Sequence, residues 1–170
     1  MKKLYLIRHA KSSWDNPDLD DFDRPLNSRG EKDAPHMGNQ LKEMRLTPDV
    51  AITSPAKRAL DTCIAITARL GFPKKNITID NRMYHASEEE LLNIVRQLKD
   101  HPNDNEETVL LFGHNPGLTN FANQLLNEAI VNIPTTGIVG ATLSIQKWED
   151  AKWGCGKMIL FDFPKNKIKQ

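Results

Sequence analysis

Hydrophobic residues along this chain follow two spacings that alternate from one segment to the next. Short apolar runs are typical of strands buried on both faces, whereas apolar residues that recur every three or four positions are typical of helices packed on a sheet. The apolar runs lie at residues 4–7, 49–53, 77–79 and 108–112. The segments with helical spacing lie at residues 31–44, 55–70, 87–98 and 118–126. This alternation predicts an α/β domain with a mainly parallel sheet.

The helix predicted at residues 55–70 has the strongest local signals. Ser54 belongs to the residue types that cap helix N-termini, and Pro55 suits the first turn, where its missing N–H costs nothing. At the other end, Gly71 favours termination of the helix. We therefore expect Ser54 to be the N-cap.

The C-terminal part of the chain has a different pattern. Residues 139–148 alternate between apolar and polar, residues 157–163 are mostly apolar, and two glycines lie between them. Alternation is typical of antiparallel strands, and glycines favour the turn between them. The pattern predicts a hairpin or an antiparallel edge on an otherwise parallel sheet.

One segment fits neither spacing. Residues 10–29 contain Pro17, Pro25 and five Asp without any sustained period. A structureless segment of about 20 residues is uncommon inside a compact domain and is usually functional. Because it directly follows the first predicted strand, we expect a functional loop there.

The composition argues against several classes of protein. The chain has 170 residues, enough for one domain of ordinary size. Its 23 Lys and Arg balance 22 Asp and Glu, for a net charge of +1, and both signs are interspersed. Proteins that bind nucleic acid or membrane surfaces usually have a basic excess, so neither partner is expected. A charged substrate must therefore be bound by local groups.

The chain also has no sequence signal for export or for metal binding. Its apolar runs are far shorter than the ~20 residues that span a bilayer, and the run after Met1 meets Arg8 before any cleavage site. Cys63 and Cys155 form no Cys-x-x-Cys pair, so we expect both to be free and buried. The five histidines show no His-x-His or His-x-x-x-His spacing, which argues against a metal site. We expect a cytoplasmic protein that needs no cofactor.

Cationic and imidazole side chains follow three of the predicted strands. They are Arg8 and His9 after the first strand, Arg58 after the second, and His114 after the strand at residues 108–112. Ligands of open parallel sheets bind beyond the carboxyl ends of the strands, so these side chains are expected to meet. Guanidinium groups beside a helix N-terminus suit phosphate oxygens. A neutral imidazole of His9 or of His114 can attack phosphorus, although a single histidine after a strand is also compatible with a structural role.

Three motifs carry a resemblance to a known family. They are LIRHAKS at residues 6–12, TSPAKRALDT at residues 53–62 and FGHNP at residues 112–116. In this order they resemble the motifs of the histidine phosphatase (phosphoglycerate-mutase-like) superfamily. The short length, with RPLN at residues 24–27 and RG at residues 29–30, is most similar to the SixA-type phosphohistidine phosphatases. The resemblance implies a single-domain, three-layer α/β/α fold over residues 1–163, and we expect residues 164–170 to form a solvated tail.

The resemblance also implies roles for particular side chains. The nucleophile, which becomes phosphohistidine, is His9. The groups that bind the transferred phosphoryl group are Arg8, Arg58 and His114. Ser12 and Arg24 are candidates for further substrate contacts from the long loop, although Arg24 can equally form a surface ion pair with a neighbouring aspartate.

The chain departs from the family at two places. Ala10 replaces the glycine of the first motif, which is a small change. Where members usually carry a carboxylic acid after the third strand, this chain has His85, and Glu88 is either an alternative acid or a plain helix-start residue. An imidazole that leaves from phosphohistidine can depart already protonated near neutral pH, so a weak acid suffices. This departure, with no evident insertion over the site, favours phosphohistidine on a protein as the substrate.

Other functions use the same residues. A phosphatase of small phosphomonoesters needs the same cations, and so does a catalytically weak phosphate-binding module, which does not need His9 as a nucleophile. Metal-dependent hydrolysis is disfavoured by the histidine spacing. We expect a monomer whose partner is a phosphorylated protein or a small phosphorylated substrate.

Overall fold

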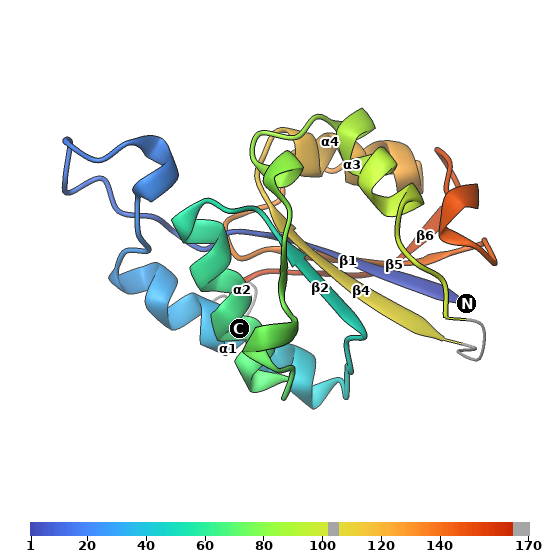
Figure 1. The fold of residues 1–170 in the computed structure, drawn as a ribbon, viewed down its shortest axis with the longest axis horizontal. Coiled ribbons are helices and arrows are strands. Elements are labelled where there is room, and N and C mark those ends of the chain that lie inside the picture. Colours follow the sequence, from blue (N-terminus) through green and yellow to red (C-terminus); the bar gives the residue numbers. More distant parts are fainter. Residues whose placement is uncertain (102–105, 165–170) are drawn as a thin grey trace.

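The predicted apolar runs and helical segments form the strands and helices of one sheet-based domain. The computed structural model describes residues 1–101 and 106–164, and within them one six-stranded sheet has the order β3-β2-β4-β1-β5-β6 (Figure 1). Its strands are β1 (Lys2–Arg8), β2 (Val50–Thr53), β3 (Thr78–Ile79), β4 (Glu107–Gly113), β5 (Ile138–Leu143) and β6 (Gly156–Asp162). The α-helices of the same residues are α1 (Ser28–Glu43), α2 (Lys57–Arg69), α3 (Glu88–Arg96) and α4 (Gly117–Leu126).

The sheet is parallel on one side and antiparallel on the other. β1 and β2 both pair parallel with β4, and β3 pairs parallel with β2. β5 runs antiparallel to β1, and β6 runs antiparallel to β5. Neighbouring parallel strands need crossover connections, which the helices between them supply. The prediction of a mainly parallel sheet with an antiparallel C-terminal edge is confirmed.

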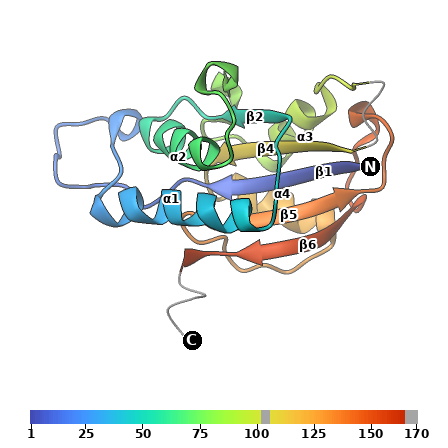
Figure 2. The same cartoon turned by 90° about the horizontal axis from the view of Figure 1, so that it is seen from below.

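The helices lie in two layers, one on each face of the sheet. Helices α1 and α2 cover one face, and α3 and α4 cover the other, as the two views show (Figure 1, Figure 2). The core cluster beneath α3 and α4 includes Leu91, Phe121 and Trp148. The cluster beneath α1 and α2 includes Met37, Leu41 and Ile66. This arrangement confirms the three-layer α/β/α fold.

The strand register brings three carboxyl ends to one edge of the sheet. Arg8 at the end of β1 pairs with Gly113 at the end of β4, and Thr53 at the end of β2 pairs with Phe112. The next residue of each strand therefore begins a loop at this shared edge. The fold thus places the candidate residues that follow β1, β2 and β4 beside one another.

The start of α2 differs from the prediction. The helix begins at Lys57, and its N-cap position is Ala56 rather than Ser54. Ser54 directly follows β2 and stays bonded to β4, because its N–H donates to the Phe112 carbonyl at 3.0 Å. Its hydroxyl oxygen accepts the Ala56 N–H at 3.2 Å and so stabilises the turn before the helix. The Ser54 cap prediction is wrong for this reason, while the predicted end is confirmed by Gly71 with φ of +70°.

The long loop after β1 is shorter and more ordered than predicted. Helix α1 begins at Ser28, three residues before its predicted start, because the Asn27 side chain accepts the backbone N–H three residues on at 2.8 Å. The β1–α1 loop, residues 9–27, contains a 3-10 turn at Asp21–Asp23. An antiparallel bridge between Ser12 and Leu26 closes it at its base.

Other expectations concern the cysteines and the chain ends. Cys63 and Cys155 are free and buried, as predicted. Among the helices of the described residues, none has the length and apolarity needed to cross a bilayer. The predicted tail begins at Pro164, which is buried, and residues 165–170 lie outside the described residues. The polar loop predicted before β4 also falls partly outside them, at residues 102–105.

Candidate active site

Two imidazoles and three guanidiniums gather at the shared edge of the sheet. The ring centroids of His9 and His114 are 5.2 Å apart. The positive charges of Arg58, Arg8 and Arg24 are near enough to His9 to lower the pKa of its ring. The side chains come from different elements, since His9 follows β1, Arg58 lies in the first turn of α2, and His114 follows β4. The structure therefore brings together these four residues and Arg24, which the sequence offered as a candidate for a further substrate contact.

The ring of His9 carries a lone pair on Nε2. Its Nδ1 lies 2.8 Å from the Ala10 carbonyl oxygen, which can only accept, so Nδ1 carries the proton and Nε2 does not. His9 is only 8% exposed. Burial is the main cause that lowers its pKa to about 4, and the neighbouring guanidiniums act in the same direction. The ring is therefore neutral near pH 7 and able to act as a nucleophile.

A buried threonine holds the backbone of this nucleophile in place. The Ala10 N–H donates to the Thr62 hydroxyl oxygen at 2.9 Å, and the Thr62 hydroxyl donates to the Arg58 carbonyl at 2.7 Å. Thr62 is fully buried in α2. The loop that carries His9 is thus joined to the helix that carries Arg58. Sequence reasoning placed Thr62 in the second motif without assigning it any role.

His114 is also buried and neutral. Its Nε2 lies 2.8 Å from the Ser54 hydroxyl oxygen. Its Nδ1 is buried and has no hydrogen-bond partner among the described residues. Burial, followed by repulsion from the protonated form of His9 and from Arg58, lowers its pKa to about 3. Ser54 was expected only as a helix cap, so its contact with His114 was missed.

The guanidinium groups of Arg8 and Arg58 are held by hydrogen bonds to the backbone, and all three guanidiniums retain buried N–H groups. Arg8 donates from Nη1 to the Ile133 carbonyl at 2.9 Å, and burial followed by the charge of Arg58 lowers its pKa. Arg58 donates from Nη1 to the backbone carbonyl of Asp21. Among the described residues, the buried guanidinium nitrogens without a partner are Nε of Arg8, Nε of Arg58, and Nε and Nη1 of Arg24. Such N–H groups suit the oxygens of a phosphoryl group.

The carboxylate of Asp21 lies against these cations. Its oxygens accept from Nη2 of Arg58 at 3.0 Å and from the Tyr84 hydroxyl at 2.7 Å, and Nη2 of Arg24 lies 3.3 Å away. Burial alone raises the pKa of Asp21, but the hydrogen bonds from Tyr84 and Arg58 outweigh it and lower the pKa to about 2. From the sequence, Asp21 was only one of the neighbouring aspartates that could pair with Arg24. The only signal for it was the excess of aspartates beside Arg24.

Arg24 and Ser12 belong to the β1–α1 loop, and their positions differ. Arg24 is 7% exposed and forms the ion pair with Asp21, so the ion pair considered from the sequence exists but is buried at the site. The Trp14 ring covers its guanidinium at 3.5 Å. Ser12 is buried and its backbone pairs with Leu26. Among the described residues, its hydroxyl makes no hydrogen bond to the imidazoles or guanidiniums of the site. Substrate contact by Ser12 stays a prediction.

The candidates for a proton donor lie at the rim. Nε2 of His85 is 3.8 Å from Oδ2 of Asp21, and its ring centroid is 6.0 Å from that of His114. The side chain of His85 is 62% exposed, and its backbone has a φ of +58°, an unusual conformation for this residue type. Glu88 begins α3 and makes no hydrogen bond or ion pair with the cluster in the described part of the chain. A cavity of about 250 Å³ lies beside His85, lined also by Glu88, Asn115 and Asn120.

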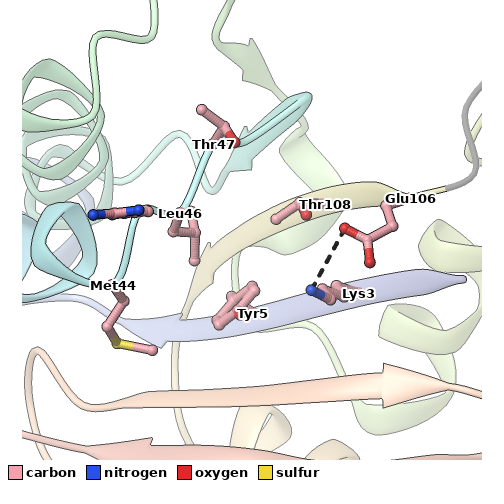
Figure 3. A pocket seen from close by; sticks show the side chains of 8 residues that line it. Lys3, Tyr5, Met44, Leu46, Thr47, Glu106 and Thr108 are labelled. Atoms are coloured by element: carbon pink, nitrogen blue, oxygen red, sulfur yellow. Dashed lines mark ion pairs between the residues drawn. The ribbon is translucent and has the colours of Figure 1, made fainter.

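A second cavity lies near the amino ends of β1 and β4 (Figure 3). Its volume is about 130 Å³, and its lining includes Lys3, Tyr5, Arg45 and Glu106. Lys3 and Glu106 form an ion pair across it at 3.8 Å, as the dashed line marks. Lys3 and Glu106 are therefore paired with each other, and the lining has no imidazole. Over the described residues, no group of three or more His, Cys, Asp or Glu is arranged to hold a metal ion.

Comparisons with known proteins agree with this geometry. The model of the histidine phosphatase superfamily (branch 1) matches residues 4–84. An uncharacterised protein of Mycobacterium tuberculosis is 30% identical over 171 residues, which cover 94% of this chain and 100% of the relative. A SixA structure from Agrobacterium tumefaciens has 26% identity and a TM-score of 0.76, and the match covers 95% of this chain and 97% of that one. A structure of the protein histidine phosphatase SixA with tungstate has 22% identity and a TM-score of 0.81, covering 97% of this chain and 99% of that one. The chain therefore belongs to the histidine phosphatase superfamily, and it is similar to SixA.

Proposed function

We propose that this protein is a phosphatase that acts through a phosphohistidine at His9 and prefers phosphohistidine on a protein as its substrate. The observation that carries the proposal is the state of His9. Its ring is buried and neutral, its Nδ1 proton is bound by the Ala10 carbonyl, and its Nε2 keeps a lone pair on a ring that has guanidinium charges near it. A binding module has no use for a nucleophile prepared in this way.

The phosphoryl group binds to the cations that surround His9. Arg8, Arg58 and Arg24 offer N–H groups to its oxygens, and the ring of His114 lies 5.2 Å from that of His9. In the free protein the carboxylate of Asp21 is the partner of Arg58 and Arg24. When substrate binds, its doubly charged phosphoryl group takes the place of this carboxylate as the partner of the two arginines. Fixed cations stabilise the charge on the equatorial oxygens in the transition state, and loss of one such donor costs about 3–4 kcal/mol of barrier.

The reaction has two steps. Nε2 of His9 forms a bond to phosphorus while the bond to the leaving nitrogen or oxygen breaks, and the leaving group takes up a proton from the surrounding water. Water then attacks phosphorus and releases a proton to solvent, the bond to Nε2 breaks, phosphate leaves, and the ring of His9 returns to its starting state. An imidazole leaving group needs little acid catalysis near neutral pH, which suits a site whose rim offers His85 rather than a carboxylic acid. The cations repel divalent metal ions, so the steps use none.

The surroundings of the site support a protein substrate. The β1–α1 loop, which carries Asp21 and Arg24, also exposes large apolar side chains around the site. They are Trp14, Leu19 and Phe22, which are 75%, 38% and 39% exposed. Phe22 packs edge-on against Tyr84, so this apolar surface reaches the site itself. Exposed aromatic residues are frequent in protein–protein contacts.

A small phosphomonoester is the second candidate substrate. The cavity of about 250 Å³ beside His85 has room for a small polar leaving group, and Asn115 and Asn120 in its lining offer hydrogen bonds. Hydrolysis of such a substrate demands a stronger acid than an imidazole leaving group does. Relative rates on the two substrate classes decide between them.

The test is a set of time courses in the presence of EDTA on a phosphohistidine protein, a phosphoserine peptide and small phosphosugars. We expect the phosphohistidine protein to be hydrolysed fastest, with labelled phosphate trapped on His9 after rapid quenching. His9→Ala should abolish turnover, whereas His36→Ala in α1, outside the cluster, should keep it. Full activity of His9→Ala, or label on another residue, contradicts the mechanism. Faster turnover of phosphosugars contradicts the substrate, and loss of activity in EDTA contradicts the metal-free steps.

A further inference from the structure

The hydrogen bonds of His114 decide what its ring offers to a bound phosphoryl group. Nε2 lies 2.8 Å from the Ser54 hydroxyl oxygen, and Nδ1 is buried without a partner among the described residues. A neutral imidazole has one N–H and one lone pair, so the bond at one nitrogen determines the state of the other. Burial and nearby positive charges favour this neutral form, because they lower the pKa of His114 to about 3.

The hydrogen bonds of Ser54 leave one arrangement in which every group is satisfied. Ser54 is fully buried, and its hydroxyl oxygen accepts the Ala56 N–H at 3.2 Å. Its hydroxyl proton also needs an acceptor, and in the described part of the chain the only other group bonded to this hydroxyl is Nε2 of His114. A proton on Nε2 would turn that bond around and leave the hydroxyl proton buried without an acceptor, which is unfavourable.

We infer that Ser54 is a positioning residue that donates to Nε2 of His114 and thereby keeps the proton of that ring on Nδ1. The Nδ1–H group is then free to donate to an oxygen of the phosphoryl group, a step that rests on the proposed function. The ring of His9, 5.2 Å away, has the same tautomer but leaves its other nitrogen free, because its Nδ1–H donates to Ala10 and its Nε2 keeps the lone pair. One hydrogen bond thus sets the role of each histidine. The bond to Ser54 makes His114 a donor, and the bond to Ala10 makes His9 a nucleophile.

The direct test is the tautomer of His114 in the unmodified protein. Long-range ¹H–¹⁵N correlation spectra at pH 7 distinguish a protonated ring nitrogen from a bare one, and His114→Gln identifies the signals. We expect His114 with a proton on Nδ1 and a bare Nε2. A proton on Nε2 overturns the inference, whatever the activity of the protein. This measurement requires no turnover, so failure of the proposed function and failure of the inference are separate outcomes.

Variants test the part played by Ser54. In Ser54→Ala we expect signal for a proton on Nε2 of His114, a fall in kcat of about tenfold or more, and weaker binding of inorganic tungstate. Ser54→Thr keeps a hydroxyl and should restore the Nδ1–H form. Thr67→Ala removes a different buried hydroxyl, which lies in α2 and donates to the Cys63 carbonyl, and should change neither the tautomer nor kcat. An unchanged His114 spectrum and unchanged tungstate affinity in folded Ser54→Ala contradict the role of Ser54.

Discussion

At the scale of single residues, the site depends on histidines that stay neutral. Burial and the surrounding guanidiniums lower the pKa of His9 to about 4 and that of His114 to about 3. A free histidine titrates near pH 6.5. The folded protein therefore keeps the lone pair of His9 available well below neutral pH, and this has a cost in stability at acidic pH.

The cost can be measured by the pH dependence of unfolding. Between about pH 4 and pH 6.5 the unfolded chain binds a proton at His9 that the folded chain does not, so the free energy of unfolding falls as the pH drops through this range. The free energy of unfolding should fall between pH 7 and pH 4.5 in both His9→Gln and the unmodified protein. The fall should be smaller in His9→Gln, and the difference between the two falls should be about 2 kcal/mol. Urea denaturation at both pH values measures it. The control is His36→Gln, and equal losses in all three proteins contradict the prediction.

At the scale of elements, the β1–α1 loop supplies the charge that holds the free site together. Sequence spacing indicated that residues 10–29 formed a functional loop but did not reveal which side chain faced the cations. The 3-10 turn at Asp21–Asp23 places the carboxylate of Asp21 on Arg58 and Arg24. Helical or strand periodicity cannot predict such a contact, because it depends on how an irregular segment folds over the end of the sheet.

Removal of this carboxylate should have two opposite effects. In Asp21→Asn the arginines lose their negative partner, so the free protein should be less stable, while inorganic tungstate no longer competes with a charge and should bind several-fold more tightly. Thermal unfolding and titration calorimetry measure the two quantities. Asp23→Asn, in the same turn but without contact to the cluster in the described residues, is the matched control. Weaker tungstate binding in Asp21→Asn contradicts the competition.

At the scale of the whole molecule, β1 and β4 have the candidate active site at one end and a buried polar network at the other. Lys2 pairs with Glu107 at 3.2 Å, and Glu107 also accepts from Nε1 of Trp148 at 3.0 Å. Lys2 and Glu107 are only 5% and 1% exposed. The hydrogen bonds and the charge of Lys2 outweigh burial and lower the pKa of Glu107. The network joins the first strand, β4 and the segment after β5.

Breaking this network should destabilise the protein without changing its chemistry. In Glu107→Gln we expect a loss of about 3 kcal/mol, the lower end for a broken buried pair, because Asp100 still pairs with Lys2 at 2.9 Å. Since the pKa of Glu107 is lowered, its contribution is present above about pH 4.5 and is lost as the pH falls further. Denaturant titration measures the loss. Glu106→Gln, which removes the exposed partner of Lys3, should have little effect. A change in kcat of the folded Glu107→Gln variant contradicts the separation of the two ends.

Much of the fold and part of the candidate site could be predicted from the sequence. The alternation of apolar runs and helical segments depends on burial at each position, so it indicated the strands, the helices and the antiparallel edge. Arg8, His9, Arg58 and His114 were predicted to meet because each follows or adjoins the carboxyl end of a strand, and such ends share one edge of a parallel sheet. Local residue types also indicated the end of α2 at Gly71.

Only the tertiary structure decided the contacts between residues far apart in the chain. Ser54 has the residue type of a helix cap, yet its hydroxyl contacts His114, because β2 and β4 end side by side. Asp21 reaches Arg58, and Thr62 reaches Ala10, across separate elements. The residue type determines which hydrogen bonds a side chain can make, while the packing of strands and loops determines which partner is within reach. The chemical groups of the site were therefore set by the sequence alone, and their protonation states and partners by the fold.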